Sequence, residues 1–350
     1  MYAPKFVITN AILKNIGIIE AAKEVIDHAP LLPYYEKQFQ KDALVRTVHH
    51  GTHIEGNELN ESQAEKVIDG QNIVARERDV QEVINYRKVM EQLEQLRITN
   101  DQLSITHKVI QDIHQLTVDK ILDDEKRGKY RETQVVVKNN QTGQVSFRPP
   151  EASEVFDQLT GFLAYLNDPT TEEVHAVLKS GIVHYELARI HPFVDGNGRV
   201  ARALSTLVLF TNGYDTRRFF SLEEYFDNDA DAYYKALQSV FKKDGDLSEW
   251  LEYFTKGLAI ELSKIKDKVE KISVDGKLRQ KLGGKPLLLT DRQLKIIEFI
   301  QENGYLQNKM FDSLFPMISE DTVLNEIKEL VQKGIIKKQG TTKGAKYVMG

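Results

Sequence analysis

Residues 191–202 read HPFVDGNGRVAR and bring an unusual set of side chains into one short stretch. The residue before a proline is biased away from helical torsions, so a helix over residues 174–190 is predicted to end just before His191. Two glycines then precede a second helical pattern over residues 199–212. The stretch is therefore predicted to be a loop that leads into the N-terminus of a helix.

The side chains of this loop suit one kind of chemistry. Free N–H groups and the helix dipole attract anions to a helix N-terminus. Arg199 and Arg202 are three residues apart, so they share one helix face and can bind phosphate oxygens. Asp195 offers a hard oxygen ligand for Mg²⁺, and His191 is placed to take a proton from an attacking hydroxyl. Each feature alone is common in proteins, but together they indicate phosphoryl or nucleotidyl transfer.

The composition narrows the class of protein. The chain has 350 residues, 41% of them hydrophobic and 28% charged, which is typical of globular domains. A net charge of -5 argues against a globally basic nucleic-acid binder, and the absence of cysteine excludes disulfides and thiolate metal sites. No apolar run approaches the ~20 residues of a membrane span, and no secretory signal pattern is recognisable. We expect a cytoplasmic protein with no membrane partner.

Apolar residues at three- and four-residue spacing predict further helices. These helices are expected over residues 80–97, 103–122, 154–167 and 231–241. Short β-branched runs at residues 133–137 and 145–147 flank a turn rich in Asn and Gly, which predicts a β-hairpin. The fold class is therefore mainly α, with one hairpin inserted among the helices.

The C-terminal part has its own organisation. Residues 261–286 continue an amphipathic helix and end in Gly-Gly-Lys-Pro, which predicts a linker. Three helices and two short strands follow, an order that predicts a winged helix-turn-helix domain over residues 287–350. This segment has nine Lys and Arg residues against eight Asp and Glu residues. Because phosphate neutralisation dominates affinity for nucleic acids, a protein-docking or dimer role is as well supported as DNA binding. A gel shift at low salt separates these alternatives.

The loop at residues 191–202 resembles the signature of the Fic family, H-P-F-x-(D/E)-G-N-G-R-x-x-R, at every fixed position. The resemblance extends over about residues 30–255. Within it, GKYR at 128–131 and RPP at 148–150 resemble the entry and exit of the family's flap hairpin. It implies a Fic helical-bundle fold with a β-hairpin flap. The expected organisation is an N-terminal helical region (1–100), a catalytic core (101–260), a linker helix (261–286) and a winged helix-turn-helix (287–350).

The resemblance also implies an activity: transfer of AMP from ATP, with Mg²⁺, to a Ser, Thr or Tyr hydroxyl of a target protein, the chain itself included. His191 would be the general base, and Asp195 would hold Mg²⁺. The implied ATP-binding residues are Asp195, Gly196, Asn197, Gly198, Arg199, Arg202 and Tyr233. The implied target-positioning residues of the flap are Val137, Lys138, Asn139 and Asn140, which would pair with the target like a strand. A family asparagine near the adenine has no clear counterpart, and Phe241 lies close to its register.

A second stretch, GTHIEGN at residues 51–57, is similar to the family's inhibitory motif, (S/T)-x-x-x-E-(G/N). Glu55 and Gly56 match, whereas Gly51 stands where the family has Ser or Thr. The resemblance implies that Glu55 pairs with Arg202, removes the clamp on the γ-phosphate and leaves ATP misplaced for attack. The alternative for Glu55 is an exposed side chain in the turn that ends a helix.

Two other functions stay open at this point. One is a DNA-binding regulator whose core senses a nucleotide, and a His191→Ala substitution would spare that activity while abolishing transfer. The other is removal of AMP from a modified protein, with Glu55 activating water. A homodimer is a further partner that the sequence allows. His49 and His53 have the i,i+4 spacing of a metal pair, but two ligands are too few for a site.

Overall fold

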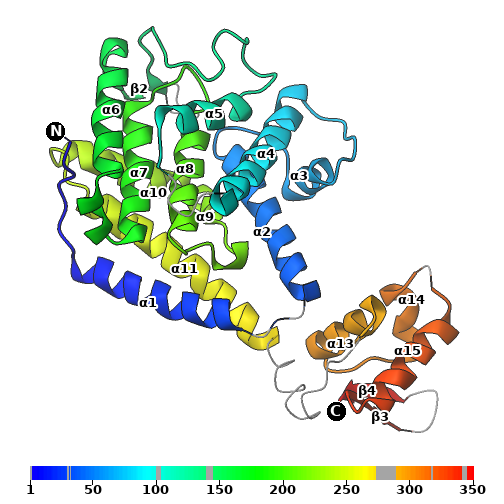
Figure 1. Ribbon diagram of the computed structural model, residues 1–350. Helices are drawn as coiled ribbons and strands as arrows, with labels where there is room; N and C mark the ends of the chain where they lie inside the picture. Colours follow the sequence, from blue (N-terminus) through cyan, green and yellow to red (C-terminus); the bar gives the residue numbers. More distant parts are fainter. Residues whose placement is uncertain are drawn as a thin grey trace. The chain divides into compact units, whose positions relative to one another are not determined.

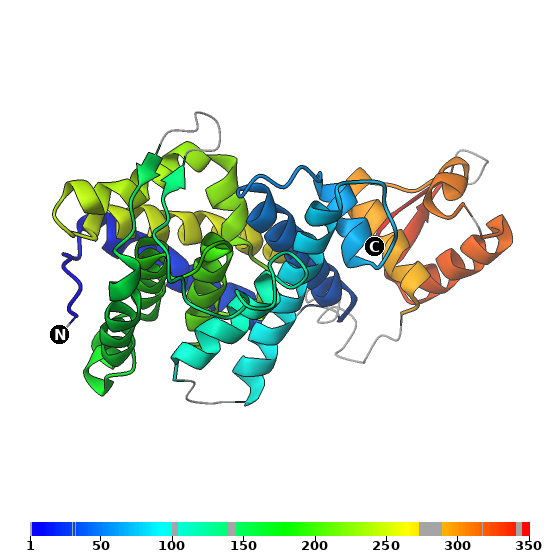
Figure 2. The same ribbon diagram turned by 90° about the horizontal axis from the view of Figure 1, so that it is seen from above.

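The computed structural model describes residues 2–29, 31, 33–99, 104–138, 145–272, 289–316, 318–340 and 345–350. The chain forms two compact units, Met1–Ala29 with Glu36–Val269, and Pro30–Tyr35 with Glu270–Gly350. Figures 1 and 2 show that helices dominate both, with one small hairpin in each. The prediction of a mainly α fold is confirmed. None of the described helices is long and apolar enough to cross a membrane.

The helices up to residue 272 are α1 (Asn10–His28), α2 (Pro33–His53), α3 (Glu61–Ile68), α4 (Glu77–Thr99), α5 (His107–Thr117), α6 (Val155–Leu166), α7 (Ala176–Ile190), α8 (Asn197–Thr211), α9 (Leu222–Asn228), α10 (Ala230–Lys242) and α11 (Ser248–Ile272). Short 3₁₀ turns lie at η1 (Ala152–Glu154), η2 (Pro169–Glu173) and η3 (Thr216–Arg218). The flap hairpin is β1 (Val137–Lys138) with β2 (Val145–Phe147).

The centre of the first unit is the pair α7 and α8, which carries the loop between them (Figure 1). Both helices are buried along most of their length, so apolar residues occur on all their faces. Helices α4 and α5 pack on α8, and α6 packs on α7. Helix α11 approaches α7 at Gly181, whose carbonyl accepts a 2.8 Å hydrogen bond from the indole of Trp250. These contacts hold α7 and α8, and so the two ends of the loop, in place.

Two elements differ in extent from their prediction. Helix α5 ends at Thr117 rather than near residue 122, because Asn85 of α4 donates to the carbonyls of Thr117 and Asp119 and so replaces helical bonding there. The chain then turns through Lys120, which has a positive φ of 58°. In the hairpin, strand β1 begins only at Val137. Before it, the Thr133 carbonyl accepts from the Arg131 side chain, and the Gln134 side chain donates to the carbonyl of Pro149. Asn139 and Asn140 lie outside the described residues.

The second unit contains α13 (Asp291–Asn303), η4 (Asn308–Met310), α14 (Phe311–Leu314), α15 (Glu320–Gln332), β3 (Ile336–Gln339) and β4 (Lys346–Met349). Strands β3 and β4 pair antiparallel, and Leu306 exchanges two backbone hydrogen bonds with Tyr347. Apolar side chains of all three helices and both strands form one core. The order of elements agrees with the predicted one; its assignment as a winged helix stays a prediction.

Candidate active site

The loop between α7 and α8 is shaped by two residues with left-handed backbone. His191 closes α7 with φ 51° and ψ 59°, and its N–H donates to the carbonyl of Leu187. Gly196 precedes α8 with φ 79°, a conformation that favours glycine, and a Cβ there would lie 2.9 Å from Val118 Cγ1. No side chain caps the N-terminus of α8. The first N–H groups of this 15-residue helix are thus available to an anion.

The same loop is braced from below by buried side chains. Asn197 accepts a 2.8 Å hydrogen bond from the N–H of Phe193 and donates a 2.9 Å one to its carbonyl. The Phe193 ring is fully buried and stacks on His114 with centroids 3.7 Å apart. His114 accepts from Gly128 N–H through Nδ1 and so donates from Nε2 to the carbonyl of Asp195. Burial lowers the pKa of His114 to about 4, consistent with this neutral tautomer.

The Asn197 side chain is therefore occupied by the loop itself. Its role as a phosphate contact, implied by the family resemblance, stays a prediction.

His191 has the tautomer that a general base needs. Its Nδ1 lies 3.3 Å from the carbonyl of Ala188, which can only accept, so Nδ1 carries the proton and Nε2 carries the free lone pair. Burial lowers the pKa of His191 below its usual value, while the charges of Glu55 and Asp195 act in the opposite direction. The neutral ring that can accept a proton therefore predominates near neutral pH.

Arg131, which was not among the predicted site residues, braces the loop. It is 3% exposed, and its guanidinium donates to the carbonyls of His191, Thr133 and Pro150 at 2.8, 3.3 and 2.6 Å. Its own N–H donates to the carbonyl of Pro192. One side chain thus ties the loop to the entry and the exit of the flap hairpin. The arginine in GKYR was the available signal, but only as part of a family pattern.

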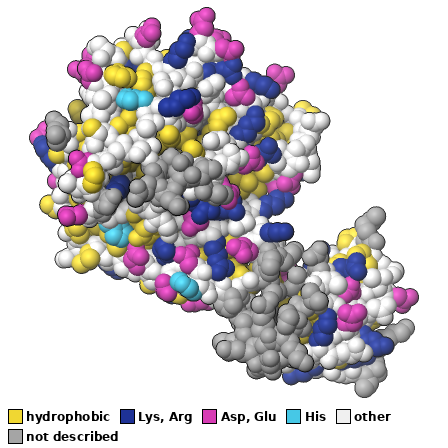
Figure 3. Space-filling view, viewed as in Figure 1, with side chains coloured by type: hydrophobic (Ala, Val, Ile, Leu, Met, Phe, Trp, Pro, Cys, Tyr) yellow, Lys and Arg dark blue, Asp and Glu magenta, His cyan; other side chains and the backbone are white. Residues whose placement is uncertain are grey.

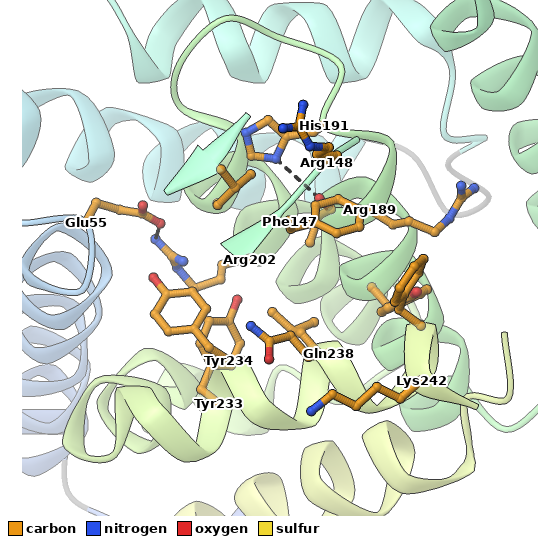
Figure 4. Close-up of a pocket in the computed structure, with 16 residues that line it drawn as sticks. Glu55, Phe147, Arg148, Arg189, His191, Arg202, Tyr233, Tyr234, Gln238 and Lys242 are labelled. Carbon is orange, nitrogen blue, oxygen red and sulfur yellow. Dashed lines mark hydrogen bonds and ion pairs between the residues drawn. The ribbon is translucent and has the colours of Figure 1, made fainter. Parts of the chain in front are cut away.

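Both signature arginines are 2% exposed. Arg202 Nη2 donates to Glu55 Oε1 at 2.8 Å and to the Gly51 carbonyl at 2.7 Å (Figure 4). Burial alone would lower the pKa of Arg202, but Glu55 raises it above its usual value. Arg199 makes only long ionic contacts, and its Nε and Nη1 have no hydrogen-bond partner among the described residues. Buried donors without partners fit a site that receives an anion.

The Glu55–Arg202 ion pair was expected, and the geometry around it explains the unusual Gly51. Glu55 lies in the turn after α2, where Gly56 adopts φ 96°. A Cβ on Gly51 would overlap with the fully buried ring of Tyr86. The main-chain carbonyl of Gly51, rather than a side chain, makes the second contact to Arg202. A glycine at this position therefore holds the turn close to α4 and α8.

Asp195 has a partly exposed carboxylate that is bound by groups of the protein at both oxygens. Its Oδ1 accepts from the N–H of Gly196, and its Oδ2 accepts from Arg78 of α4 at 2.8 Å. Burial raises the pKa of Asp195, but Arg199, the Gly196 N–H and Arg78 together hold it below its usual value. The carboxylate is thus ionised, and its side chain is 34% exposed. These are properties of a Mg²⁺ ligand shared with phosphates, although no group of three or more metal-binding side chains occurs among the described residues.

A cavity of about 570 Å³ lies in front of the loop. Its lining includes Glu55, Gly198, His191 and Arg202, together with Val137 and Phe147 of the flap. Helix α10 contributes Tyr233, Tyr234, Leu237, Gln238, Phe241 and Lys242, and Figure 4 shows Tyr233 and Tyr234 beside Arg202. The volume is in the range of small-molecule sites and would accommodate a nucleotide.

The structure thus brings most of the predicted site residues together. Six of them line the cavity: Glu55, Val137, His191, Gly198, Arg202 and Tyr233. Tyr233 is 3% exposed and its hydroxyl bonds His184 Nε2 at 2.8 Å, while Phe241 is 77% exposed. Asp195, Gly196, Asn197 and Arg199 lie in the loop and α8 but do not line this cavity. Lys138 is placed by its backbone in β1.

The charge on the second unit is mixed. Helix α15 exposes Asp321 and Glu329 as well as Lys328, and the face drawn in Figure 3 shows Lys and Arg side chains beside Asp and Glu side chains. Lys346 lies over the ring of Tyr305 at 4.2 Å, so this cation is engaged within the unit. The face drawn in Figure 3 thus carries charges of both signs, whereas phosphate backbones attract basic surfaces.

Comparison with known proteins gives three consistent results. Residues 104–209 match the model of the Fic/DOC family. The chain is 28% identical over 190 residues to protein adenylyltransferase fic-1 of Caenorhabditis briggsae, a match that covers 51% of this chain and 34% of that protein. It is 27% identical over 203 residues to protein adenylyltransferase Fic of Nematostella vectensis, covering 55% and 44%. The chain thus matches less than half the length of these relatives.

The solved structures agree on the fold. A Fic family protein from Desulfovibrio desulfuricans superposes with a TM-score of 0.69 at 23% identity, covering 100% of this chain and 98% of that one. Fic-1 from C. elegans superposes with a TM-score of 0.60 at 23% identity, covering 74% and 73%. Residues 104–209, which include the loop between α7 and α8, therefore match the Fic/DOC family in sequence, and the chain shares the fold of solved Fic proteins.

Proposed function

We propose that this chain is a protein adenylyltransferase that transfers AMP from ATP to a hydroxyl side chain of a target protein and is inhibited by its own Glu55. The observation that carries the proposal is the arrangement of one loop. A histidine with a free Nε2 lies beside an uncapped helix N-terminus and two buried arginines, all facing the same small cavity or the loop that bounds it. The names of the relatives support the same activity.

The proposed reaction uses each group at a defined bond. The ATP phosphates lie against the N–H groups of α8, with the arginines neutralising the β- and γ-phosphates. The target hydroxyl gives its proton to Nε2 of His191 as its oxygen bonds the α-phosphorus. The bond from that phosphorus to the β-phosphate oxygen breaks, and pyrophosphate leaves. Mg²⁺, held by Asp195 and phosphate oxygens, would offset the charge that develops on the leaving group.

Glu55 opposes this reaction in the resting state. Its carboxylate occupies Arg202 and lies over Gly198, where a Cβ would overlap with its Oε1. The third phosphate needs the same guanidinium, and the two anions repel each other. ATP then either binds poorly or binds with its α-phosphorus out of line for attack. What releases Glu55 is a separate question from the chemistry.

The decisive test uses the variant without the inhibitory carboxylate. Glu55→Gly protein is incubated with ATP labelled at the α-phosphate, Mg²⁺ and a host lysate, and modified proteins are identified by mass spectrometry. We expect AMP on a Ser, Thr or Tyr side chain, the chain's own hydroxyls included. Adding His191→Ala should abolish the labelling without weakening ATP binding. Labelling that survives loss of His191, or an unlabelled lysate despite tight ATP binding, would refute the assignment.

A second experiment tests the alternative function, removal of AMP from a modified protein. Pre-modified target is added to wild-type and Glu55→Gly protein without ATP, and release of AMP is followed. Release that needs Glu55 would favour the reverse chemistry, with this carboxylate activating water.

A further inference from the structure

Arg78 makes an ion pair that the proposed reaction does not use. It lies in the first turn of α4, and its Nη2 donates to Asp195 Oδ2 at 2.8 Å. The other oxygen, Oδ1, already accepts from the N–H of Gly196 and faces Arg199 at 3.5 Å. Both oxygens of Asp195 are thus engaged within the protein, and Oδ2 is held by a cation.

The pairs on either side of the loop are complementary. The carboxylate of Glu55 pairs with Arg202, which would hold a phosphate. The guanidinium of Arg78 pairs with Asp195, which would hold a divalent cation. A negative group therefore occupies the anion position and a positive group occupies the cation ligand. Each buried or half-buried charge of the loop has an opposite charge in the absence of nucleotide, which avoids the cost of an unpaired charge.

The two pairs are joined through Glu82, which is 5% exposed. Its Oε1 accepts from Arg78 Nε at 3.1 Å and lies 3.4 Å from Arg199, while its Oε2 accepts from Asn57 Nδ2 at 3.0 Å. Asn57 follows Glu55 by two residues and also donates to the carbonyl of Asp79. The segment that carries the inhibitory carboxylate and the arginine on Asp195 are thus fixed by one buried acid.

We propose that Arg78 is a second inhibitory residue, which competes with the divalent cation for Asp195 as Glu55 competes with the phosphate for Arg202. The inference rests on the proposed function. Arg78 suits this role because its side chain is 60% exposed, so it can leave Asp195 for solvent while Glu82 and Arg199 stay buried. We call the Glu55–Arg202 and Arg78–Asp195 ion pairs together the two-part lock. Nucleotide binding displaces Glu55 from Arg202, metal binding displaces Arg78 from Asp195, and Glu82 transmits the change from one pair to the other.

This proposal predicts that Asp195 binds a divalent cation more weakly when Arg78 is present than when Arg78 is removed. An exposed ion pair contributes up to about 1 kcal/mol, or about fivefold in an equilibrium constant. Removing Arg78 should therefore tighten cation binding about fivefold. Arg76 provides a matched control, because it carries the same charge two residues earlier and is 55% exposed. Its ionic partners are Asp79 and Glu58, not Asp195.

The test measures cation binding directly. Mn²⁺ is titrated into Glu55→Gly protein saturated with a non-hydrolysable ATP analogue, and free Mn²⁺ is followed by electron paramagnetic resonance. The same titration is run with Arg78→Ala, Arg78→Gln and Arg76→Ala added. We expect both Arg78 variants to lower the Kd for Mn²⁺ about fivefold and Arg76→Ala to leave it unchanged. Adding Asp195→Asn should abolish the gain.

The outcomes separate the two proposals. An unchanged or weaker Mn²⁺ affinity in the Arg78 variants, with thermal unfolding showing intact folds, would overturn the competing role. Equal tightening by Arg76→Ala would reduce the effect to net charge and overturn it as well. Calorimetry of the analogue alone tests the proposed function: if Glu55→Gly protein binds no nucleotide, both proposals fall. If it binds nucleotide and only the Arg78 effect is missing, the adenylyltransferase assignment stands.

Discussion

Replacing Glu55 by glycine should raise AMP transfer and lower the stability of the fold at the same time. Two unit charges about 4 Å apart interact by about 4 kcal/mol at an effective dielectric constant of 20. Glu55 is 29% exposed, so solvent screens part of its repulsion with the terminal phosphate. We take about half of this repulsion energy, ~2 kcal/mol, as what the substitution removes. This corresponds to an increase of about 30-fold in the rate of AMP transfer at subsaturating ATP. Release of Arg202 as a phosphate ligand acts in the same direction.

The same substitution should lower the stability of the nucleotide-free protein, although it raises the transfer rate. Without Glu55, the buried Arg202 guanidinium loses its carboxylate partner and keeps only neutral neighbours among the described residues, such as the Gly51 carbonyl. An unsatisfied buried group costs about 1–3 kcal/mol, so the melting temperature of the nucleotide-free variant should fall by a few degrees. ATP with Mg²⁺ should restore it, because the phosphate replaces the lost carboxylate.

The assay compares initial rates of incorporation from α-labelled ATP with melting curves in the presence and absence of nucleotide. Glu58→Gly is the matched control, since it removes a carboxylate three residues away that is 74% exposed and pairs only with the exposed Arg76. It should change neither quantity by much. A Glu55→Gly protein with an unchanged rate, or with a rate raised no more than in Glu58→Gly, would refute the reasoning about Arg202.

Three further substitutions or conditions test other parts of the site. Because the charge of Glu55 raises the pKa of His191, Glu55→Gly should move the acidic limb of the rate profile to lower pH; a shift to higher pH would contradict the assignment of His191 as the base. Gly51→Ala places a methyl group against the Tyr86 ring, so it should cost about 1–3 kcal/mol in a denaturant titration and raise basal transfer as the turn moves away. Arg131→Lys keeps the charge but cannot form the forked contacts, so it should lower kcat at least tenfold while the Kd for ATP stays within about twofold; equal losses in both would point to general unfolding.

Much of the fold was predictable because its signals are local. The end of α7 follows from the proline after His191, and the helical periodicity of residues 80–97 and 231–241 anticipates α4 and α10. The boundary of α5 was not predictable, since Asn85 from another helix satisfies its last carbonyls. The late start of the first flap strand was not predictable either, since Arg131 binds the Thr133 carbonyl and Gln134 binds the Pro149 carbonyl before the strand begins.

The candidate site likewise has residues that could be predicted from the sequence and residues that could not. The loop residues are adjacent in sequence, so their chemistry could be inferred from spacing. Arg131 and Arg78 lie about 60 and 117 residues from their partners in the loop, and a lone arginine in a helical or turn segment carries no sign of its acceptor. Gly51 gave a misleading signal, because a glycine in a helix usually weakens it. Here the absent side chain is what admits the Tyr86 ring.

The hold of Arg131 on both ends of the flap has a consequence for specificity. Under the proposed function, a target peptide would pair with the edge of the flap hairpin, whose base shares the Arg131 guanidinium with the carbonyl of His191. A displacement of the hairpin by the peptide would then also displace the imidazole that accepts the proton. A poorly fitting sequence would be rejected by slow chemistry as much as by weak attachment, so competing substrates should differ in turnover more than in affinity.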